Sequence, residues 1–216
     1  MDVLVAGGHG KVALRLLWLL AAEGHRARGL IRKAEQAADL EEVGAVAVLG
    51  DLEADASLAE YAQGADAVVF AAGAGPGSGP ARKRTVDLGG AVKLVDAARA
   101  VGARRYVMVS SIGADRPGAA SGAMRPYLEA KAEADQYLMA SGLEYTIVRP
   151  GSLTDDPGTG RVRVSTELGG RGAVPRDDVA AVLARALDAP NTIGVTFELF
   201  GGDLPVAEAV RSLTGR

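Results

Sequence analysis

Tyr127 and Lys131 stand four residues apart in a segment with helical periodicity, so their side chains are expected on one face of a helix. A tyrosine hydroxyl, whose reference pKa is about 10, can give or take a proton at neutral pH when a cation lies beside it. Lys131 would supply that charge, and a serine hydroxyl would hold the substrate oxygen. The alternative is a surface Tyr–Lys pair on an amphipathic helix.

A glycine-rich loop directly follows the first apolar run, residues 3–6. It reads Gly7-Gly8-His9-Gly10-Lys11-Val12-Ala13, which has the spacing G-x-x-G-x-x-A. Gly7 permits a sharp exit from a strand, Gly10 lets a pyrophosphate approach the N-terminus of a helix, and Ala13 lets that helix pack closely. The loop therefore predicts dinucleotide binding, and its alternative is a tight turn without a ligand. His9 either donates to a phosphate or is solvated.

The residues after the second predicted strand favour NADP(H) over NAD(H). NAD-binding loops of this kind place an acid there to bind the ribose 2′-hydroxyl. This chain has Arg32 and Lys33 instead, a planar cation and a point charge that suit a 2′-phosphate. A solvated helix start is the alternative. Asp51, which precedes Leu52 after the third predicted strand, would accept from the adenine amino group or cap a helix.

Apolar runs and amphipathic segments alternate along the chain with short connections. Strands are predicted at residues 3–6, 26–31, 46–49, 66–71, 105–109 and 145–148. Helices are predicted at residues 11–23, 35–43, 58–62, 86–101 and 127–140. The strands are apolar throughout, as expected where helices cover both faces. The pattern therefore predicts an α/β fold with a Rossmann-type, doubly wound parallel sheet.

Beyond Gly151 the pattern is looser. A short strand is predicted at residues 162–164, a helix at 177–187, a strand at 195–200 and a helix at 205–213. No linker separates a second domain. Residues 1–216 are therefore interpreted as one NAD(P)-binding Rossmann domain, in which residues 151–216 form a small C-terminal extension.

Three loops rich in glycine, proline or serine would edge the substrate pocket, at residues 73–82, 112–125 and 152–174. They would act as a mobile lid or would be plain surface loops. Ile112, Met124 and Leu153 would give this pocket an apolar lining. Short edges of this kind suit a small or flat substrate.

The composition limits the possible chemistry. The chain has 216 residues, a net charge of −3, no cysteine and two histidines. Disulfides, thiolate metal sites and cysteine nucleophiles are excluded, and a histidine-built metal site is nearly excluded. The negative charge and the 4% aromatic content argue against nucleic-acid binding, and no apolar stretch is long enough for a membrane span. Without a visible secretion signal, a cytoplasmic protein with a small-molecule substrate is expected, as a monomer or a homodimer.

Together these segments resemble the short-chain dehydrogenase/reductase superfamily, in particular its atypical, NAD(P)-binding, epimerase/dehydratase-like members. They are also similar to flavin and biliverdin reductases and to NmrA-like proteins. The resemblance extends from Val3 to about Val210. It rests on Gly7-x-x-Gly10-x-x-Ala13, Ile31-Arg32-Lys33, Gly50-Asp51-Leu52, Ala71-Ala72-Gly73, Val86-Asp87-Leu88, Val109-Ser110-Ser111, Tyr127-x-x-x-Lys131 and Arg149-Pro150-Gly151.

The resemblance implies an active site in which Ser111, with Ser110 as the alternative, acts together with the Tyr–Lys pair. Lys131 would also reach the nicotinamide ribose. Asp87 stands where the family commonly has an asparagine, and this departure puts a proton relay through that residue in doubt. The residues implied to pass close to the cofactor are Ala71, Ala72, Gly73, Ser110, Pro150 and Gly151.

The function expected from the resemblance is an NADP(H)-dependent oxidoreductase. Hydride would pass between nicotinamide and a small carbonyl, quinone or flavin-like acceptor, with Tyr127 handling the proton. One alternative is an NADP(H)-sensing regulator of the NmrA type, which has no turnover. The other is an epimerase or dehydratase that retains its cofactor.

Overall fold

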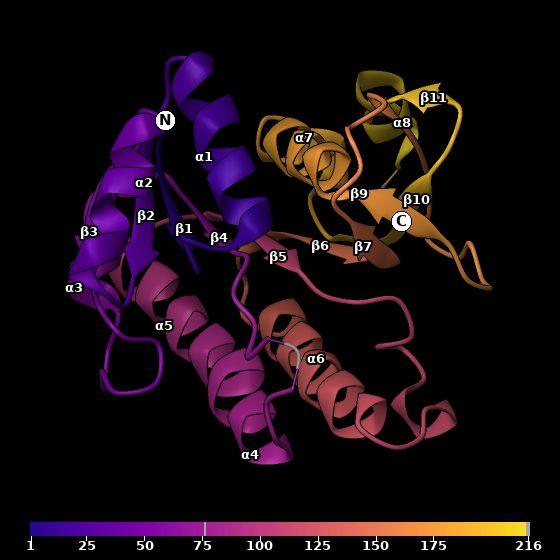
Figure 1. The fold of residues 1–216 in the computed structure, drawn as a ribbon, viewed down its shortest axis with the longest axis horizontal. Coiled ribbons are helices and arrows are strands. Elements are labelled where there is room, and N and C mark those ends of the chain that lie inside the picture. The colour runs from indigo at the N-terminus through magenta and orange to yellow at the C-terminus, as the bar shows by residue number, and fades with distance from the viewer. Residues whose placement is uncertain (76, 215–216) are drawn as a thin grey trace.

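The computed structural model of the chain describes residues 1–75 and 77–214 (Figure 1). In these ranges the main sheet has nine strands in the order β11-β8-β10-β6-β5-β4-β1-β2-β3. Their bounds are β1 (Asp2–Ala6), β2 (Arg26–Ile31), β3 (Val46–Leu49), β4 (Ala67–Phe70), β5 (Arg105–Val109), β6 (Glu144–Pro150), β8 (Arg161–Ser165), β10 (Val195–Gly201) and β11 (Leu204–Pro205). The strands from β3 to β10 in this order pair in parallel, and the topology switches direction between β1 and β4. The predicted α/β, Rossmann-type fold is confirmed.

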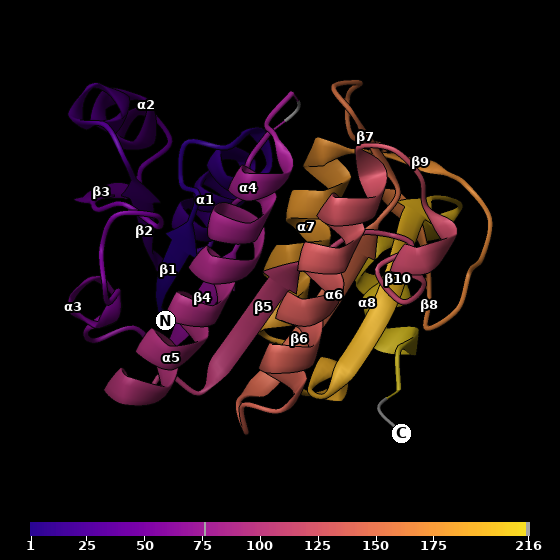
Figure 2. The same ribbon diagram turned by 90° about the horizontal axis from the view of Figure 1, so that it is seen from below.

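Helices cover both faces of this sheet. The α-helices are α1 (Lys11–Ala22), α2 (Ala37–Glu42), α3 (Ala59–Ala62), α4 (Pro80–Arg82), α5 (Ala91–Val101), α6 (Met124–Met139), α7 (Arg176–Leu187) and α8 (Val206–Ser212). Shorter or irregular turns are η1 (Ala34–Gln36), η2 (Lys83–Gly90, a π-helix), η3 (Pro117–Ala119) and η4 (Pro190–Thr192). Figure 1 shows α1 and α7 on one side of the sheet and α5 and α6 on the other, and Figure 2 shows α5 and α6 in front of the strands. No helix in the described ranges combines the length and the apolar character needed to cross a bilayer.

Consecutive residues of β1 face the two helical layers in turn. Val3 and Val5 belong to the buried cluster that includes α1 and α7, whereas Leu4 and Ala6 belong to the cluster beneath α5 and α6. All four side chains are fully buried. The strand is apolar without alternation because both of its faces are covered.

The C-terminal part of the sheet departs from the purely parallel arrangement that the sequence predicts. β8 pairs antiparallel with both β10 and β11, since a strand added at a free edge needs no crossover helix. Residues 152–174 were expected to be a loop apart from 162–164. They contain β7 (Ser152–Thr154), which pairs with β9 (Ala173–Pro175) in a separate parallel sheet. Three-residue strands are too short to show a period of two in the sequence.

Two helices near the carboxyl edge of the sheet begin earlier than predicted. The helix predicted at 86–101 starts as η2 at Lys83, directly after α4, and continues as α5. The helix predicted at 127–140 is α6, which begins at Met124. As a result Tyr127 lies in the first turn of α6, and η2 carries side chains that the sequence had placed in a loop.

Gly102 ends α5 in the left-handed region, with φ of 78°. A Cβ added there would meet no heavy atom within 4 Å, so Gly102→Ala is expected to lower the free energy of unfolding by about 1 kcal/mol through backbone strain alone. Gly118→Ala is the matched control, because Gly118 also faces open space but has no positive φ. Urea denaturation measures the free energy of unfolding of both variants. Equal losses in the two would contradict the assignment of strain to the positive φ of Gly102.

Candidate active site

A crevice lies at the carboxyl ends of the central strands, beside the topological switch between β1 and β4. It consists of two adjoining cavities that share Ala71, Ala72 and Gly73. The Arg32 cavity has a volume of about 360 Å³ and is formed by the ends of β1, β2 and β3. The Tyr127 cavity has a volume of about 660 Å³ and is formed by the ends of β4, β5 and β6 with η2 and α6. In this architecture a dinucleotide binds across such a crevice.

The glycine loop between β1 and α1 forms one wall of the Arg32 cavity. Gly7 has φ of 79°, and a Cβ on it would stand 2.7 Å from Cα of Ala72. The N–H of Gly10 donates to the carbonyl of Gly7 at 2.7 Å, which closes the turn onto the first N–H groups of α1. Among the residues that the structure describes, no side chain caps α1 and no acid lies in its first turn. This N-terminus is therefore free to receive an anion such as a pyrophosphate.

Three other residues of this loop have different positions. Gly8 does not line either cavity; a Cβ on it would lie 2.8 Å from Cα of Gly29 in β2, so its role is close packing of the loop on that strand. The side chain of Lys11 is turned away to Asp155, with Nζ 2.5 Å from Oδ2. Val12 lines the Tyr127 cavity.

His9 lines the Arg32 cavity, where two contacts hold its ring while 36% of its side-chain surface stays exposed. Its Nε2 lies 2.5 Å from Oδ2 of Asp39, and its Nδ1 lies 3.1 Å from Nε2 of Gln36. Gln36 lines the same cavity. The sequence analysis did not identify Gln36, because nothing in the spacing of η1 relates it to the loop.

Of the two cations after β2, Arg32 lines the cavity and Lys33 does not. Nζ of Lys33 lies 3.4 Å from Oε1 of Glu35, outside the cavity. The guanidinium of Arg32 is half exposed and lies 3.9 Å from Oε2 of Glu53. The structure therefore brings one of the two predicted cations to the site.

Glu53 is a residue of the Arg32 cavity that the sequence analysis missed, and Arg82 lines this cavity although the sequence placed it at the edge of the substrate pocket. Nη2 of Arg82 donates to Oε2 of Glu53 at 2.8 Å, and Oγ1 of Thr85 donates to Oε1 at 2.6 Å. The hydrogen bonds from Arg82 and then Thr85 lower the pKa of Glu53. An ionised acid thus lies beside two arginines, in a loop after β3 rather than after β2, where the family pattern places the ribose-binding acid.

Asp51 and Leu52 both line this cavity. Oδ1 of Asp51 accepts the backbone N–H of Glu53 at 2.7 Å and that of Ala54 at 3.4 Å. These contacts use Oδ1 alone and cap a turn of the same loop. A hydrogen bond from the adenine amino group to Asp51 stays a prediction.

Tyr127, Lys131 and Asp87 meet in the Tyr127 cavity. Nζ of Lys131 donates to the carbonyl of Val109 at 3.1 Å, lies 3.4 Å from Oδ1 of Asp87, and lies 5.8 Å from the centre of the Tyr127 ring. Lys131 and Asp87 are buried, with 3% and 0% of their surfaces exposed. Oδ2 of Asp87 accepts the N–H of Ala74 at 3.1 Å. Asp87 is therefore the counterion that holds Lys131 beside the tyrosine.

The two serines after β5 differ in what their hydroxyls contact. Oγ of Ser110 donates to Oδ2 of Asp135 at 3.0 Å, so its proton points away from the cavity. Asp135 also accepts from Nε and Nη2 of Arg149 at 3.0 and 2.9 Å. Burial raises the pKa of Asp135, and Arg149 and Ser110 oppose that shift. In the described part of the chain, Oγ of Ser111 makes a single long contact, 3.3 Å to the carbonyl of Ile112, so it is the hydroxyl available to a substrate oxygen.

Of the three apolar residues predicted to line the substrate pocket, two do so and one does not. Met124 and Leu153 line the Tyr127 cavity, together with Pro150 and Gly151, whereas Ile112 does not. The cavity also receives Ser78 and Pro80, which belong to the predicted edge at residues 73–82, and Lys83, which the sequence did not identify. The predicted start of this helix at residue 86 left Lys83 in a loop, so no periodicity could place it.

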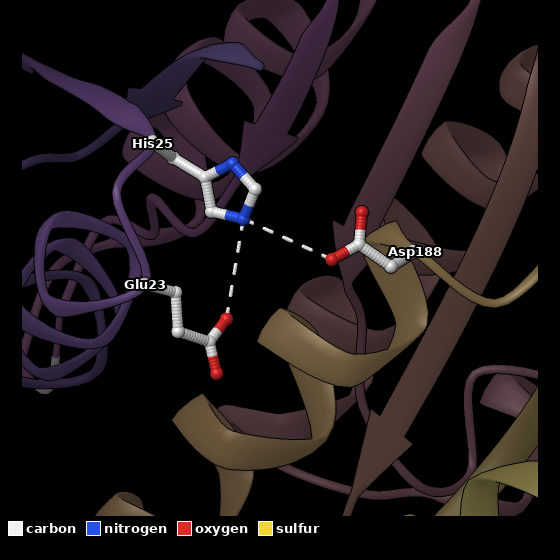
Figure 3. A group of neighbouring side chains, drawn as sticks. All are labelled: Glu23, His25 and Asp188. Carbon is white, nitrogen blue, oxygen red and sulfur yellow. Dashed lines mark ion pairs between the residues drawn. The ribbon is translucent and has the colours of Figure 1, made fainter.

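A separate cluster of Glu23, His25 and Asp188 lies at the opposite edge of the sheet (Figure 3). Nε2 of His25 lies 3.8 Å from Oδ2 of Asp188 and 4.0 Å from Oε2 of Glu23. Arg185 donates to Oε1 of Glu23 at 2.9 Å, and the amino group of Met1 lies 3.1 Å from Nδ1 of His25. Since these contacts already occupy the cluster, we assign it to ion pairing between the ends of α1 and α7.

Comparison with known proteins identifies relatives that match nearly the whole chain. The chain is 43% identical over 215 residues to the uncharacterized sugar epimerase YhfK of Bacillus subtilis, covering 99% of this chain and 100% of that protein. A solved structure of a candidate NAD-dependent epimerase/dehydratase of Bacillus halodurans matches with a TM-score of 0.94 and 43% identity, over 99% of this chain and 100% of that one. ChuY, an anaerobillin reductase of Escherichia coli O157:H7, matches with a TM-score of 0.78 and 27% identity, over 94% and 98%.

Residues 7–190 match the model of the NAD(P)H-binding family. This range contains the glycine loop, both cavities and the Tyr–Lys helix. The resemblance to atypical short-chain dehydrogenases/reductases, which rests on these same segments, is confirmed. The chain belongs to the NAD(P)H-binding family of Rossmann-fold proteins.

Proposed function

We propose that the protein is an NADP(H)-dependent oxidoreductase that transfers hydride between nicotinamide and a small carbonyl, quinone or flavin-like acceptor. The observation that carries this proposal is the position of Tyr127, Lys131 and Ser111 around one cavity, which adjoins the glycine loop through Ala71–Gly73. The crevice fits a dinucleotide because the Gly7 turn leaves room that a Cβ would fill and because α1 is uncapped. NADPH, when bound there, supplies the hydride.

The residues of the cavity would handle the oxygen of the acceptor. Oη of Tyr127 gives its proton to a carbonyl oxygen as the hydride reaches the carbon, so that one carbonyl becomes one alcohol. Oγ of Ser111 donates a hydrogen bond to the same oxygen. Nζ of Lys131, fixed by Asp87 and the carbonyl of Val109, stabilises the negative charge left on the tyrosine.

A direct test measures NADPH binding by fluorescence and then NADPH oxidation with a panel of carbonyls, quinones and flavins. We expect binding and oxidation with at least one acceptor class. Tight binding without oxidation by any of them would favour a sensor of the NmrA type instead.

A second candidate function, epimerisation or dehydration with a retained cofactor, is favoured by the names of the two relatives from Bacillus. Such an enzyme regenerates its cofactor in every cycle and therefore keeps it bound. Nucleotide released by denaturing freshly purified protein would support this candidate. Its absence, together with steady NADPH consumption, would support the oxidoreductase.

Arg32→Ala is expected to weaken NADPH binding roughly tenfold to a hundredfold and to leave NADH binding nearly unchanged, because a charge-assisted contact to the 2′-phosphate is lost. Lys33→Ala is the matched control, since Lys33 is the neighbouring cation but lies outside the cavity. Calorimetric titration with both nucleotides measures the ratio. Equal affinities for NADPH and NADH in the unmodified protein would remove the case for a 2′-phosphate site.

A further inference from the structure

Lys83 is a cation of the Tyr127 cavity to which the proposed mechanism gives no role. It lies in η2, partly buried, and its Nζ stands 5.2 Å from the centre of the Tyr127 ring. The same Nζ donates to the carbonyl of Gly75 at 2.9 Å. These two contacts fix the ammonium group on the tyrosine and leave part of its hydrogen-bonding capacity unused, because an ammonium has three donors.

Lys83 differs from the other cations around this cavity in having no acid. Within the part of the chain that the structure describes, no carboxylate pairs with it, whereas its neighbours in sequence and space each have one. These pairs are Arg82 with Glu53 at 2.8 Å, Arg84 with Glu133 at 2.5 Å, Arg125 with Glu129 at 2.9 Å and Lys131 with Asp87 at 3.4 Å. Of these, Lys131 and Asp87 line the same cavity and balance one another. The charge of Lys83 is therefore the one that remains uncompensated there.

The surroundings of Lys83 favour an anion with an apolar body. Met124, Leu153 and Pro80 contribute apolar side chains to the cavity. A charge in such a half-enclosed pocket is screened less by water than one on an open surface. An acceptor whose carbonyl oxygen reaches Tyr127 would place a neighbouring substituent beside Lys83, because the ammonium lies over the ring of that same tyrosine.

We propose that Lys83 binds the acceptor through an anionic substituent, so that the substrate is a carboxylate with its reacting carbonyl a few bonds away. The proposal rests on the oxidoreductase function for the carbonyl, but the anion site itself is independent of turnover. The proposed anion site restricts the acceptor from any small carbonyl compound to an organic acid that carries a carbonyl group.

Matched pairs of acceptors test this proposal: the three carboxybenzaldehyde isomers and their methyl esters, with NADPH as the reductant. In the unmodified protein at least one acid is expected to exceed its ester roughly tenfold in kcat/KM. Lys83→Ala is expected to remove that preference by lowering kcat/KM for the acid roughly tenfold to a hundredfold, with little change for the ester. Lys83→Arg, which keeps the charge, should restore part of it. Arg84→Ala is the control, since it removes a neighbouring cation that pairs with Glu133 outside the cavity.

Binding of benzoate and benzamide to the complex with NADP⁺, measured by calorimetry, gives a readout that needs no reaction. Benzoate should bind more tightly than benzamide, and only its affinity should fall in Lys83→Ala. If neither these aldehydes nor the panel of carbonyls, quinones and flavins is reduced but benzoate binding depends on Lys83, the oxidoreductase proposal fails and the anion site stands. If acids and esters are reduced equally well in both proteins, the anion site fails and the oxidoreductase stands.

Two further outcomes would overturn the anion site. One is an equal loss of NADPH affinity in Lys83→Ala, which would place this lysine on a cofactor phosphate. The other is the absence of any preference for the acid, or for benzoate over benzamide, in the unmodified protein.

Discussion

Tyr127→Phe is expected to lower kcat for carbonyl reduction by about 10²–10⁴-fold while NADPH binds as before, because the substitution removes only the hydroxyl that donates the proton. The ring stays in place, so the contacts of Lys83 and Lys131 with its face are kept. Ser111 still offers a hydrogen bond to the oxygen. Stopped-flow oxidation of NADPH, with binding measured separately, separates loss of chemistry from loss of affinity.

Tyr137→Phe is the matched control for this experiment. Tyr137 lies on the same helix, α6, and its hydroxyl donates to Oδ1 of Asp96 at 2.8 Å, away from both cavities. Its removal should leave kcat unchanged. If Tyr127→Phe kept full turnover, the proton role would be wrong, and a reductase of the flavin type, which needs no tyrosine acid, would take its place.

The parallel arrangement of the central strands could be predicted from the sequence because most of these strands are apolar runs followed by an amphipathic helix. β3 and β5 have the predicted bounds, at residues 46–49 and 105–109. What could not be predicted lies beyond β6. The antiparallel strand β8 and the short pair of β7 and β9 depend on edges and partners that are distant in sequence, and no local periodicity records them.

The residues of the candidate site also divide into those that local spacing predicts and those that it does not. Glycine spacing and the Tyr–Lys spacing are local patterns, so Gly7, Gly10, Tyr127 and Lys131 could be selected from the sequence, and all of them line the crevice. Two further charged residues of the crevice could not be selected. Glu53 reaches the Arg32 cavity from another loop, and Lys83 turns toward Tyr127 because η2 begins before the predicted helix. Whether a cation such as Lys83 has an acidic partner depends on tertiary contacts alone.

Compensation of charge also determines the expected behaviour of Lys131→Met. This substitution should nearly abolish turnover, because the charge that stabilises the tyrosinate is gone. It should also lower the free energy of unfolding by about 3–5 kcal/mol, since removing one partner of a buried pair leaves the other charge without a counterion. Asp87 is that partner: it is fully buried, and within residues 1–75 and 77–214 its Oδ1 has no donor near it other than the lysine 3.4 Å away.

The double variant Lys131→Met/Asp87→Asn distinguishes the two effects. The uncharged amide can still accept the N–H of Ala74, as Oδ2 of Asp87 does at 3.1 Å, and it leaves no buried charge behind. We therefore expect urea denaturation to show the double variant roughly 1–3 kcal/mol more stable than Lys131→Met, with turnover still absent. A double variant no more stable than the single one would show that Asp87 is not the counterion. Recovered turnover would show that Lys131 acts by packing, because a methionine would then serve in place of its charge.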